Sequence, residues 1–391
     1  MFKIKNKYKF LRNWPYPYKG ALSISSDVDF TNFEFFDSFM NFLNTKNNTL
    51  LGRGLGLDVT SSIFFYGLPK HTFSYYSGLE VDAKKSQYSE RLDDYMKNGL
   101  IDSNHAFGDF NYYSGFTRGH AERVYKQLHT LGVKLNVFIN HGDTKNTQNI
   151  LKNSSHHQGD RPESPSYHTD LFVENGVKYV WSEDLSVEKA APSLFSFNKN
   201  KCSLKNCLMQ DKKPITSFQR FRGTSAIAPN LSTLRYQFLS LDLNSFYKNN
   251  NYVILYQHLG VLNRSAGKCL PSSIEAIKKN ENDYLSTFYK IKDEKESGNL
   301  WVAGLSNLLN YIRNVEEIEI NKAPYVPNTY YISGSFEEGH DFSGLTFYID
   351  PKNPINIYIN DKKVLTQING LDETGKYSAT IVDMRNNKEI W

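Results

Sequence analysis

The 391-residue sequence has little of what would mark a secreted or membrane-embedded protein. It contains only three cysteines, Cys202, Cys207 and Cys269, which are too few, and odd in number, for a disulfide framework. No apolar stretch approaches the length of a membrane span. The basic N-terminal stretch "MFKIKNKYKFLRNWPYPYKG" has neither the apolar core nor the small-residue cleavage site of a secretory leader. These absences predict a protein without a membrane span, with a cytoplasmic location as the default.

Clustered charge and glycine-rich phosphate loops are also absent. The formal net charge is +5, but no basic block is longer than a few residues, which argues against nucleic acid as a partner. Neither GxGxxG nor GxxxxGK[ST] follows an apolar run, so nucleotide-binding folds lose their main support. Aromatic residues, by contrast, reach 14%. Biased codon usage, which abundant Asn and Lys also indicate, explains them better than sugar-binding clefts do.

Short apolar runs rich in Val, Ile, Leu and Tyr alternate with helix-like segments through most of the chain. Three examples are "ALSISSDVD" before residues 30–44, "VKLNVFINHGD" at 133–143 and "NYVILYQHLG" at 251–260. This alternation is typical of a parallel sheet whose faces are covered by helices. The sequence therefore predicts an α/β fold, and a (β/α) barrel is the arrangement it favours.

The pattern changes after about residue 319. From there the sequence shows alternating β-branched and aromatic residues, with turn signals such as Pro-Lys-Asn-Pro. This predicts a small, sandwich-like antiparallel β-domain. The stretch "NKAPYVP" marks the boundary, so the expected division is a barrel domain at 1–320 and a β-domain at 321–391.

Polar side chains follow several of the predicted strands, and in parallel sheets function gathers at the carboxyl ends of strands. Asp27 and Asp29 are two residues apart, so in an extended chain their side chains point the same way. Two such carboxylates repel unless a cation or a shared proton lies between them. The alternative is that Asp29 caps a helix starting near Phe30. Other strand-end residues are His105, Asn140, His141, Trp181, Glu183, Asp184 and His258.

The histidines suggest metal and proton-transfer chemistry. His105 and Asp109 are four apart in "SNHAFGDF", on one face if the segment is helical, and an imidazole with carboxylates suits a divalent ion such as zinc. His258 ends a very apolar strand, where a protonated imidazole can act as a general acid. For each histidine the alternative is a structural role. His156 and His157 lie in a polar loop and are expected to be solvated.

Taken in order, these motifs resemble the polysaccharide deacetylase superfamily, the NodB-homology carbohydrate esterases, in a divergent form. "ALSISSDVD" resembles its paired-aspartate strand, "SNHAFGD" its N-H-x-x-x-H motif, and "VILYQHLG" its late L-x-H strand. "FVENGVKYVWSEDLS" and "LWVAGLSNLLNYI" are similar to two further segments, so the resemblance spans residues 18–314. It implies a distorted (β/α)7 barrel.

Three departures from the family pattern stand out. One residue separates the aspartates, and Asp109 occupies the place of the second metal histidine. The arginine motif is blurred: Arg161 is the best positional match, with Arg220 and Arg222 as competitors. The resemblance still implies a metal-dependent deacetylase that acts on an acetylated sugar precursor of a surface glycan, removing an N-acetyl in preference to an O-acetyl group.

The resemblance also implies roles for individual residues. Asp27 would be the general base and His258 the general acid, while Asp29, His105 and Asp109 would hold one divalent ion. Zinc is the expected ion, with manganese, cobalt and nickel as alternatives. Substrate binding is expected from Arg161, Arg222 and Trp181. Asn140 and His141 have no clear counterpart in the family, and their place at a strand end favours substrate binding or oxyanion support. A turn is the alternative role for Asn140 and His141, and a core position is the alternative for Trp181.

Two other functions remain open. A glycoside hydrolase of related architecture needs no metal but places two carboxyl groups roughly 5–9.5 Å apart across a cleft. Its second carboxylate would have to come from Glu183 or Asp184. The third hypothesis is a non-catalytic glycan-binding protein that keeps the barrel fold. The fold of the β-domain does not by itself indicate a function.

Overall fold

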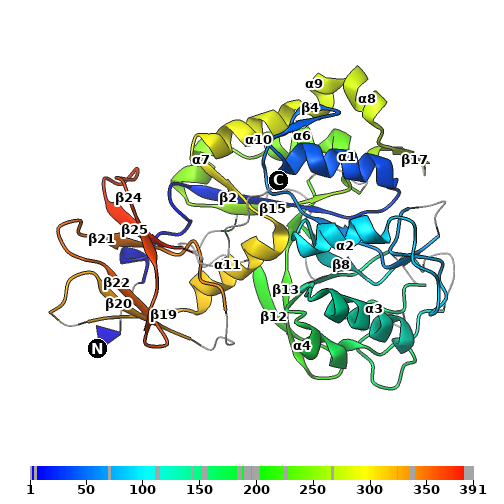
Figure 1. Ribbon diagram of the computed structural model, residues 1–391, viewed down its shortest axis with the longest axis horizontal. Coiled ribbons are helices and arrows are strands. Elements are labelled where there is room, and N and C mark those ends of the chain that lie inside the picture. Colours follow the sequence, from blue (N-terminus) through cyan, green and yellow to red (C-terminus); the bar gives the residue numbers. More distant parts are fainter. Residues whose placement is uncertain are drawn as a thin grey trace.

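The computed structural model describes residues 2–3, 7–68, 72–110, 115–142, 145–151, 156–182, 187–188, 195, 203–223, 228–265, 268–323, 325–334 and 340–382. Its largest feature is an 11-stranded sheet in the order β11-β14-β15-β2-β5-β8-β9-β10-β13-β12, with β18 also beside β2 (Figure 1). All neighbours are parallel except β12 and β13. The strands are β2 (Gly20–Ser26), β5 (Ser61–Ile63), β8 (Ile101–His105), β9 (Val137–Ile139), β10 (Tyr179–Trp181), β11 (Val187–Glu188), β12 (Leu204–Leu208), β13 (Pro214–Phe218), β14 (Arg220–Phe221), β15 (Tyr252–Gln257) and β18 (Leu300–Val302).

Strand β2 lies in the interior of this sheet and is buried along its whole length. It pairs with β15 from Ala21 to Ser26, and its other edge pairs with β18 and then with β5. Side chains alternate between the two faces: Leu22 and Ile24 pack into one hydrophobic cluster and Ala21 into another. A strand buried on both faces reads as a nearly continuous apolar run, which is why the sequence predicts it.

The α/β class is confirmed, but a closed seven-stranded barrel is not found. Within the described residues the pairing path is open, running from β11 to β12. Strands β13 and β14 lie near opposite ends of that path, yet only Gln219 separates them in the chain. The sheet must therefore curl until these two ends come together. This curvature turns the carboxyl ends of its strands toward a common centre.

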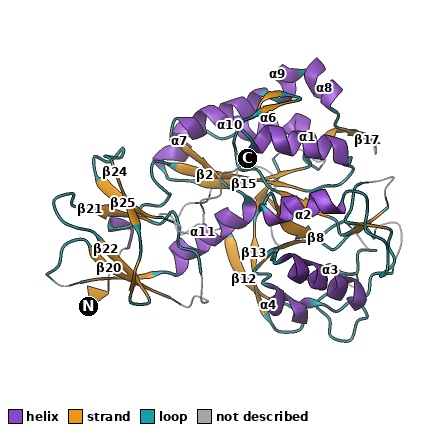
Figure 2. Cartoon of the chain, in the orientation of Figure 1, coloured by secondary structure: helices purple, strands orange, loops and turns teal. Residues whose placement is uncertain are grey.

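Helices surround the large sheet, as Figure 2 shows. They are α1 (Phe33–Asn44), α2 (Ser89–Lys97), α3 (Arg118–Leu131), α4 (Phe172–Asn175), α6 (Leu231–Leu239), α7 (Leu243–Lys248), α8 (Ile274–Lys279), α9 (Glu281–Tyr284), α10 (Ser286–Glu296) and α11 (Leu305–Glu317). The expectation that Asp29 caps a helix near Phe30 is wrong. Helix α1 begins three residues later, and the Asn32 side chain accepts a hydrogen bond from the Phe35 N–H at 2.7 Å. Among the described helices, none has the length and apolar character needed to cross a bilayer.

The C-terminal region consists mainly of strands, in a five-stranded sheet β1-β19-β20-β22-β23 and a three-stranded sheet β21-β25-β24. Their pairs are antiparallel except for β20 with β22. The expected division after residue 320 falls within β19, and β1 near the N-terminus pairs with β19. The strands are β1 (Phe2–Lys3), β19 (Glu319–Lys322), β20 (Thr329–Ser333), β21 (Thr346–Ile349), β22 (Asn356–Ile359), β23 (Lys362–Lys363), β24 (Thr366–Asn369) and β25 (Tyr377–Ile381).

An aromatic cluster around Trp14 joins the N-terminal segment to the large sheet. Trp14 is 1% exposed, packs edge-on against Tyr252 at 5.4 Å between ring centroids and stacks on Tyr311 at 5.9 Å. Its indole N–H donates to the Asn250 carbonyl at 3.1 Å. The Trp14 side chain therefore packs against both strand β15 and helix α11.

Replacing Trp14 by Ala should lower the free energy of unfolding by about 3–5 kcal/mol, because it leaves a large cavity between β15 and α11. Denaturant unfolding at pH 7 measures the change. The matched control is Tyr236→Ala on α6, where the ring is 69% exposed, and its effect should stay within about 0.5 kcal/mol. Equal losses in the two variants would contradict a joining role for Trp14.

Candidate metal centre

A cavity of about 310 Å³ lies at the carboxyl ends of the central strands, within the size range of small-molecule sites. Eight of the ten residues expected at the site line it. They follow or end β2, β8, β9, β10, β14 and β15: Asp27, Asp29, His105, Asn140, His141, Trp181, Arg222 and His258. The parallel order of these strands therefore gathers side chains that are up to 231 positions apart in the sequence.

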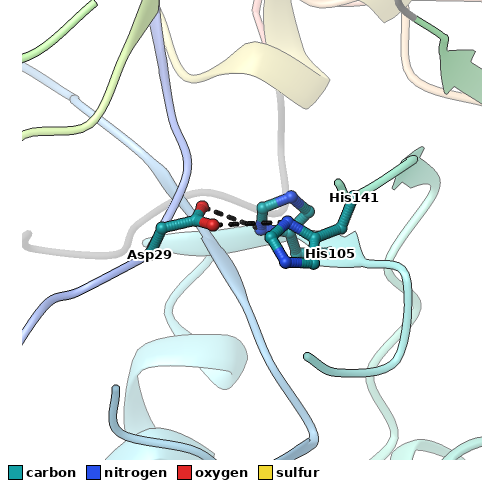
Figure 3. Close-up of side chains that lie close together, drawn as sticks. All are labelled: Asp29, His105 and His141. Atoms are coloured by element: carbon teal, nitrogen blue, oxygen red, sulfur yellow. Dashed lines mark ion pairs between the residues drawn. The ribbon is translucent and has the colours of Figure 1, made fainter. Parts of the chain in front are cut away.

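Three imidazoles surround the Asp29 carboxylate. Its Oδ1 lies 3.3 Å from His141 Nδ1, and its Oδ2 lies 3.7 Å from His105 Nδ1 and 3.5 Å from His258 Nε2. Figure 3 shows the carboxylate turned toward the rings of His105 and His141. Ligand atoms of Asp29, His105 and His141 all lie within 4.8 Å of one another.

This group of three fits a divalent metal ion. Asp29 Oδ2 and His105 Nδ1 are buried and make no hydrogen bond in the described structure. Buried polar atoms normally have partners, and a cation held between these two would satisfy both. Two histidines and one carboxylate also form the ligand set of catalytic zinc sites that keep a position open.

A second group, Asp27 with Asp29 and His258, is also compact enough to hold an ion, but the charge of Asp27 is already balanced. Arg220 Nη1 lies 2.8 Å from Asp27 Oδ1, and Nη2 lies 3.2 Å from Oδ2. The guanidinium is buried between the rings of Trp181 and Tyr256, 3.6 and 3.9 Å from their centroids. The first group is therefore the better cation site.

The environment fixes the protonation states of the cluster. Burial raises the pKa of Asp27, but Arg220 and His105 outweigh it and hold that pKa below its usual range. Burial likewise opposes ionisation of Asp29, yet His141, His258 and His105 hold its pKa well below the usual range. Burial lowers the pKa of His105 to about 4. Burial lowers the pKa of His141, but Asp29 and Asp109 outweigh it and raise that pKa above its usual value. Ionised carboxylates and neutral imidazoles are the forms that bind metal, so an ion bound here would displace a proton from His141.

The structure brings His141, and not Asp109, beside Asp29 and His105. Asp109 was expected to bind the metal, but it lies behind His141, with its Oδ1 3.3 Å from Nε2. His141 was expected to contact substrate, but it joins Asp29 and His105. The physical reason is local: Ala106 and Phe107 have φ of 49° and 62°, so the chain turns after His105 and the four-residue spacing does not place Asp109 beside it.

Strand pairing explains why His141 takes that place. Ile139 in β9 pairs with His105 in β8, so His141 follows two residues beyond the level of His105. The Phe64 ring, directly after β5, stacks on the His105 ring at 4.6 Å and meets the His141 ring edge-on at 4.9 Å. A carboxylate behind a metal-binding histidine orients its ring, and Asp109 would do so for His141 if His141 bound an ion.

Asn140 lines the cavity, but its amide holds a neighbouring loop. It donates to the Ile150 carbonyl at 2.9 Å and accepts from the Ile150 N–H at 3.1 Å. Asn149 makes the equivalent pair of bonds with the His141 backbone at 3.0 and 2.9 Å. The structural alternative for Asn140 thus fits better than substrate binding, because these bonds fix the strand end that carries His141.

The positions of the arginines in the structure differ from those expected from the match of Arg161 to the arginine motif. Arg161 lies outside the cavity lining, with its Nε donating to Gln210 Oε1 at 2.9 Å. Arg220 holds Asp27 instead. Arg222 lines the cavity, as expected, and Trp181 lines it while stacking on Arg220. Glu183 and Asp184 lie outside the described residues.

Three cavity residues with ionisable side chains were not predicted from the sequence: His157, Tyr256 and Arg264. His157 was expected to be solvated, yet it is buried, with its Nδ1–H 3.0 Å from the Ile150 carbonyl, whereas His156 is exposed. Tyr256 precedes His258 by two residues in β15, and this spacing is the one available signal that it faces the same site. Nothing comparable in the sequence marks Arg264.

Comparison of the chain with protein-family models, curated proteins and solved structures found no match. Its function is therefore inferred from the geometry of this cavity, together with the motif resemblance described above.

The Asp27–Arg220 pair predicts a pH-dependent stability difference. Arg220→Gln leaves a buried charge uncompensated and should lower the free energy of unfolding by about 3–5 kcal/mol at pH 7. The pKa of Asp27 is depressed on folding from 3.8, so the pair stabilises the protein above that value and stops doing so as pH falls through the folded-state pKa. The difference in free energy of unfolding between wild type and variant, measured by denaturant unfolding, should become smaller below pH 4. The exposed Arg235→Gln is the control, and a difference independent of pH would contradict the assignment.

Zinc titration separates the roles of His141 and Asp109. His141→Ala removes a ligand and should reduce zinc affinity more than 100-fold, whereas Asp109→Asn should weaken it by only about 10–100-fold, as loss of an orienting partner does. Isothermal titration calorimetry of metal-free protein at pH 7 measures both, with exposed His129→Ala as the control. The reverse ranking of the two variants would restore Asp109 as the ligand.

Proposed function

We propose that the chain is a metal-dependent carbohydrate deacetylase, a divergent NodB-like enzyme that removes an N-acetyl group, in preference to an O-acetyl group, from a sugar. The observation that carries this proposal is the pairing of two buried carboxylates with different partners. Asp29 faces three imidazoles, while Asp27 is fixed by a buried arginine. The curled parallel sheet supports the related proposal of a distorted (β/α)7 barrel.

Asp29, His105 and His141 would hold the ion, for which zinc is proposed and manganese, cobalt or nickel are alternatives. A divalent ion there would polarise the acyl carbonyl and lower the pKa of a water molecule from 15.7 toward about 7. This matters for Asp27, because its own depressed pKa makes it a weak base. With such an ion bound, Asp27 would be the group that accepts the proton of that water.

Arg220 keeps Asp27 ionised and holds both carboxylate oxygens in a fixed orientation. His258 has the complementary role. Its Nδ1 lies 2.7 Å from the Pro229 carbonyl, and because a carbonyl only accepts, Nδ1 carries the hydrogen. Nε2 is left facing Asp29 and the cavity. When Nε2 is also protonated, the imidazolium can deliver that proton to the departing amine and return to the neutral ring.

The sugar would lie in the cavity beside the rings of Trp181 and Tyr256. An acetylated precursor in a cytoplasmic step of surface-glycan biosynthesis is the proposed substrate.

A glycoside hydrolase is less well supported. Such enzymes need an acid with a raised pKa across the cleft from a second carboxylate. Asp27 and Asp29 both have lowered pKa values, and both lie within 4 Å of the same residue, His105. Among the described cavity residues these are the only carboxylates.

Acetate release from a panel of N-acetylated sugars by the zinc-loaded protein tests the proposal. Asp27→Asn should lower kcat by about 10²–10⁴, the usual contribution of a general base. Zinc affinity should change little, because Asp27 is paired with Arg220 and is not one of the proposed ligands. His258→Gln should lower kcat similarly, and exposed His129→Gln should not change it. If the protein binds zinc, manganese and cobalt but releases no acetate from any sugar, the glycan-binding alternative replaces the enzyme.

A further inference from the structure

One cation in the cavity has no function in the proposed chemistry. Arg264 belongs to β16 (Val261–Ser265), which pairs with β17 (Lys268–Pro271), and its side chain lines the same cavity as Asp29 and His258. Its Nε and Nη2 atoms are buried and make no hydrogen bond in the described structure. A guanidinium is always charged and carries five N–H donors, so unpaired buried donors are unfavourable.

The contacts around Arg264 do not neutralise it. Its guanidinium lies 5.3 Å from the Phe30 ring centroid, which is a weak interaction compared with an ion pair. Phe30 itself has φ of 55°, a conformation that a bulky residue adopts only when the surroundings enforce it. Arg264 and Phe30 both line the cavity and lie close to each other, so a cation and an aromatic ring are found together on one side of it.

The remaining charges of the cavity leave no described partner for Arg264. The two carboxylates of the cavity face other groups: Asp27 pairs with Arg220, and Asp29 lies among the imidazoles. Arg222 adds another positive charge to the lining. A bound divalent ion would add to this excess of positive charge and make the cavity more attractive to anions.

We propose that Arg264 binds a negatively charged group of the substrate, a carboxylate or a phosphate, so that the acetylated sugar is anionic. This inference rests on the proposed function for its placement beside the acetyl group. Both anions match the planar fork of a guanidinium, which binds them through two parallel hydrogen bonds. A neutral sugar hydroxyl would leave the charge uncompensated, so the contact discriminates between substrates.

The test uses three probes that share an N-acetylated glucose ring: neutral N-acetylglucosamine, its 1-phosphate, and the corresponding uronic acid. Their affinities are measured by calorimetry on metal-free protein, where no metal ion contributes to anion binding. Wild type should bind at least one anionic probe about 10–100-fold more tightly than the neutral one, the range for hydrogen bonds to a charged group. A preference for the 1-phosphate identifies a phosphorylated precursor, and a preference for the uronic acid identifies an acidic sugar.

Arg264→Gln should remove this preference, Arg264→Lys should keep only part of it, and exposed Arg235→Gln should keep all of it. Equal affinity for the three probes, no measurable binding of either anionic probe, or a preference retained in Arg264→Gln would each overturn the inference. The outcome is separable from catalysis. An anion preference in the metal-free protein, together with no acetate release by the zinc-loaded protein, removes the deacetylase. Acetate release from neutral sugars by the zinc-loaded protein, without the preference, removes the role of Arg264.

Discussion

The structure of the site depends on one electrostatic constraint: two carboxylates are buried side by side where β2 ends. Neither Asp27 nor Asp29 can stay ionised there unless positive charge or hydrogen-bond donors approach each of them. Arg220 comes from β14, and the histidines come from β8, β15 and the end of β9. The strand order of the sheet and its curvature bring these elements around β2, so the fold and the charge balance of the site require each other.

The two carboxylates are given different environments, which is how one site can assign different roles to similar groups. Asp27 is held in a two-pronged ion pair whose arginine is sandwiched between Trp181 and Tyr256, so its orientation is fixed. Asp29 faces only imidazoles, at distances of 3.3–3.7 Å that are longer than good hydrogen bonds. That spacing leaves room for an ion among them.

Sequence reasoning could place the α/β fold and the strand-end carboxylates because buried parallel strands read as apolar runs and their carboxyl ends meet at one edge. It could not predict the turn after His105, since periodicity carries no information on the positive φ values of Ala106 and Phe107. It could not choose Arg220 over Arg161 either, because that choice depends on β13 and β14 pairing near opposite ends of the sheet. The burial of His157 could not be predicted either, because it depends on hydrogen bonds within a loop.

Charge balance also distinguishes a ligand site from a structural polar cluster. In a purely structural cluster every buried polar atom is expected to find a partner within the chain, as the two carboxylate oxygens of Asp27 do in Arg220. Here Asp29 Oδ2, His105 Nδ1 and two nitrogens of Arg264 stay unpaired in the described structure while facing one cavity. The acceptor atoms are complementary to a cation and the donors to an anion. Folding alone gives no reason to keep both, whereas the proposed metal ion and negatively charged substrate, bound together, would account for both.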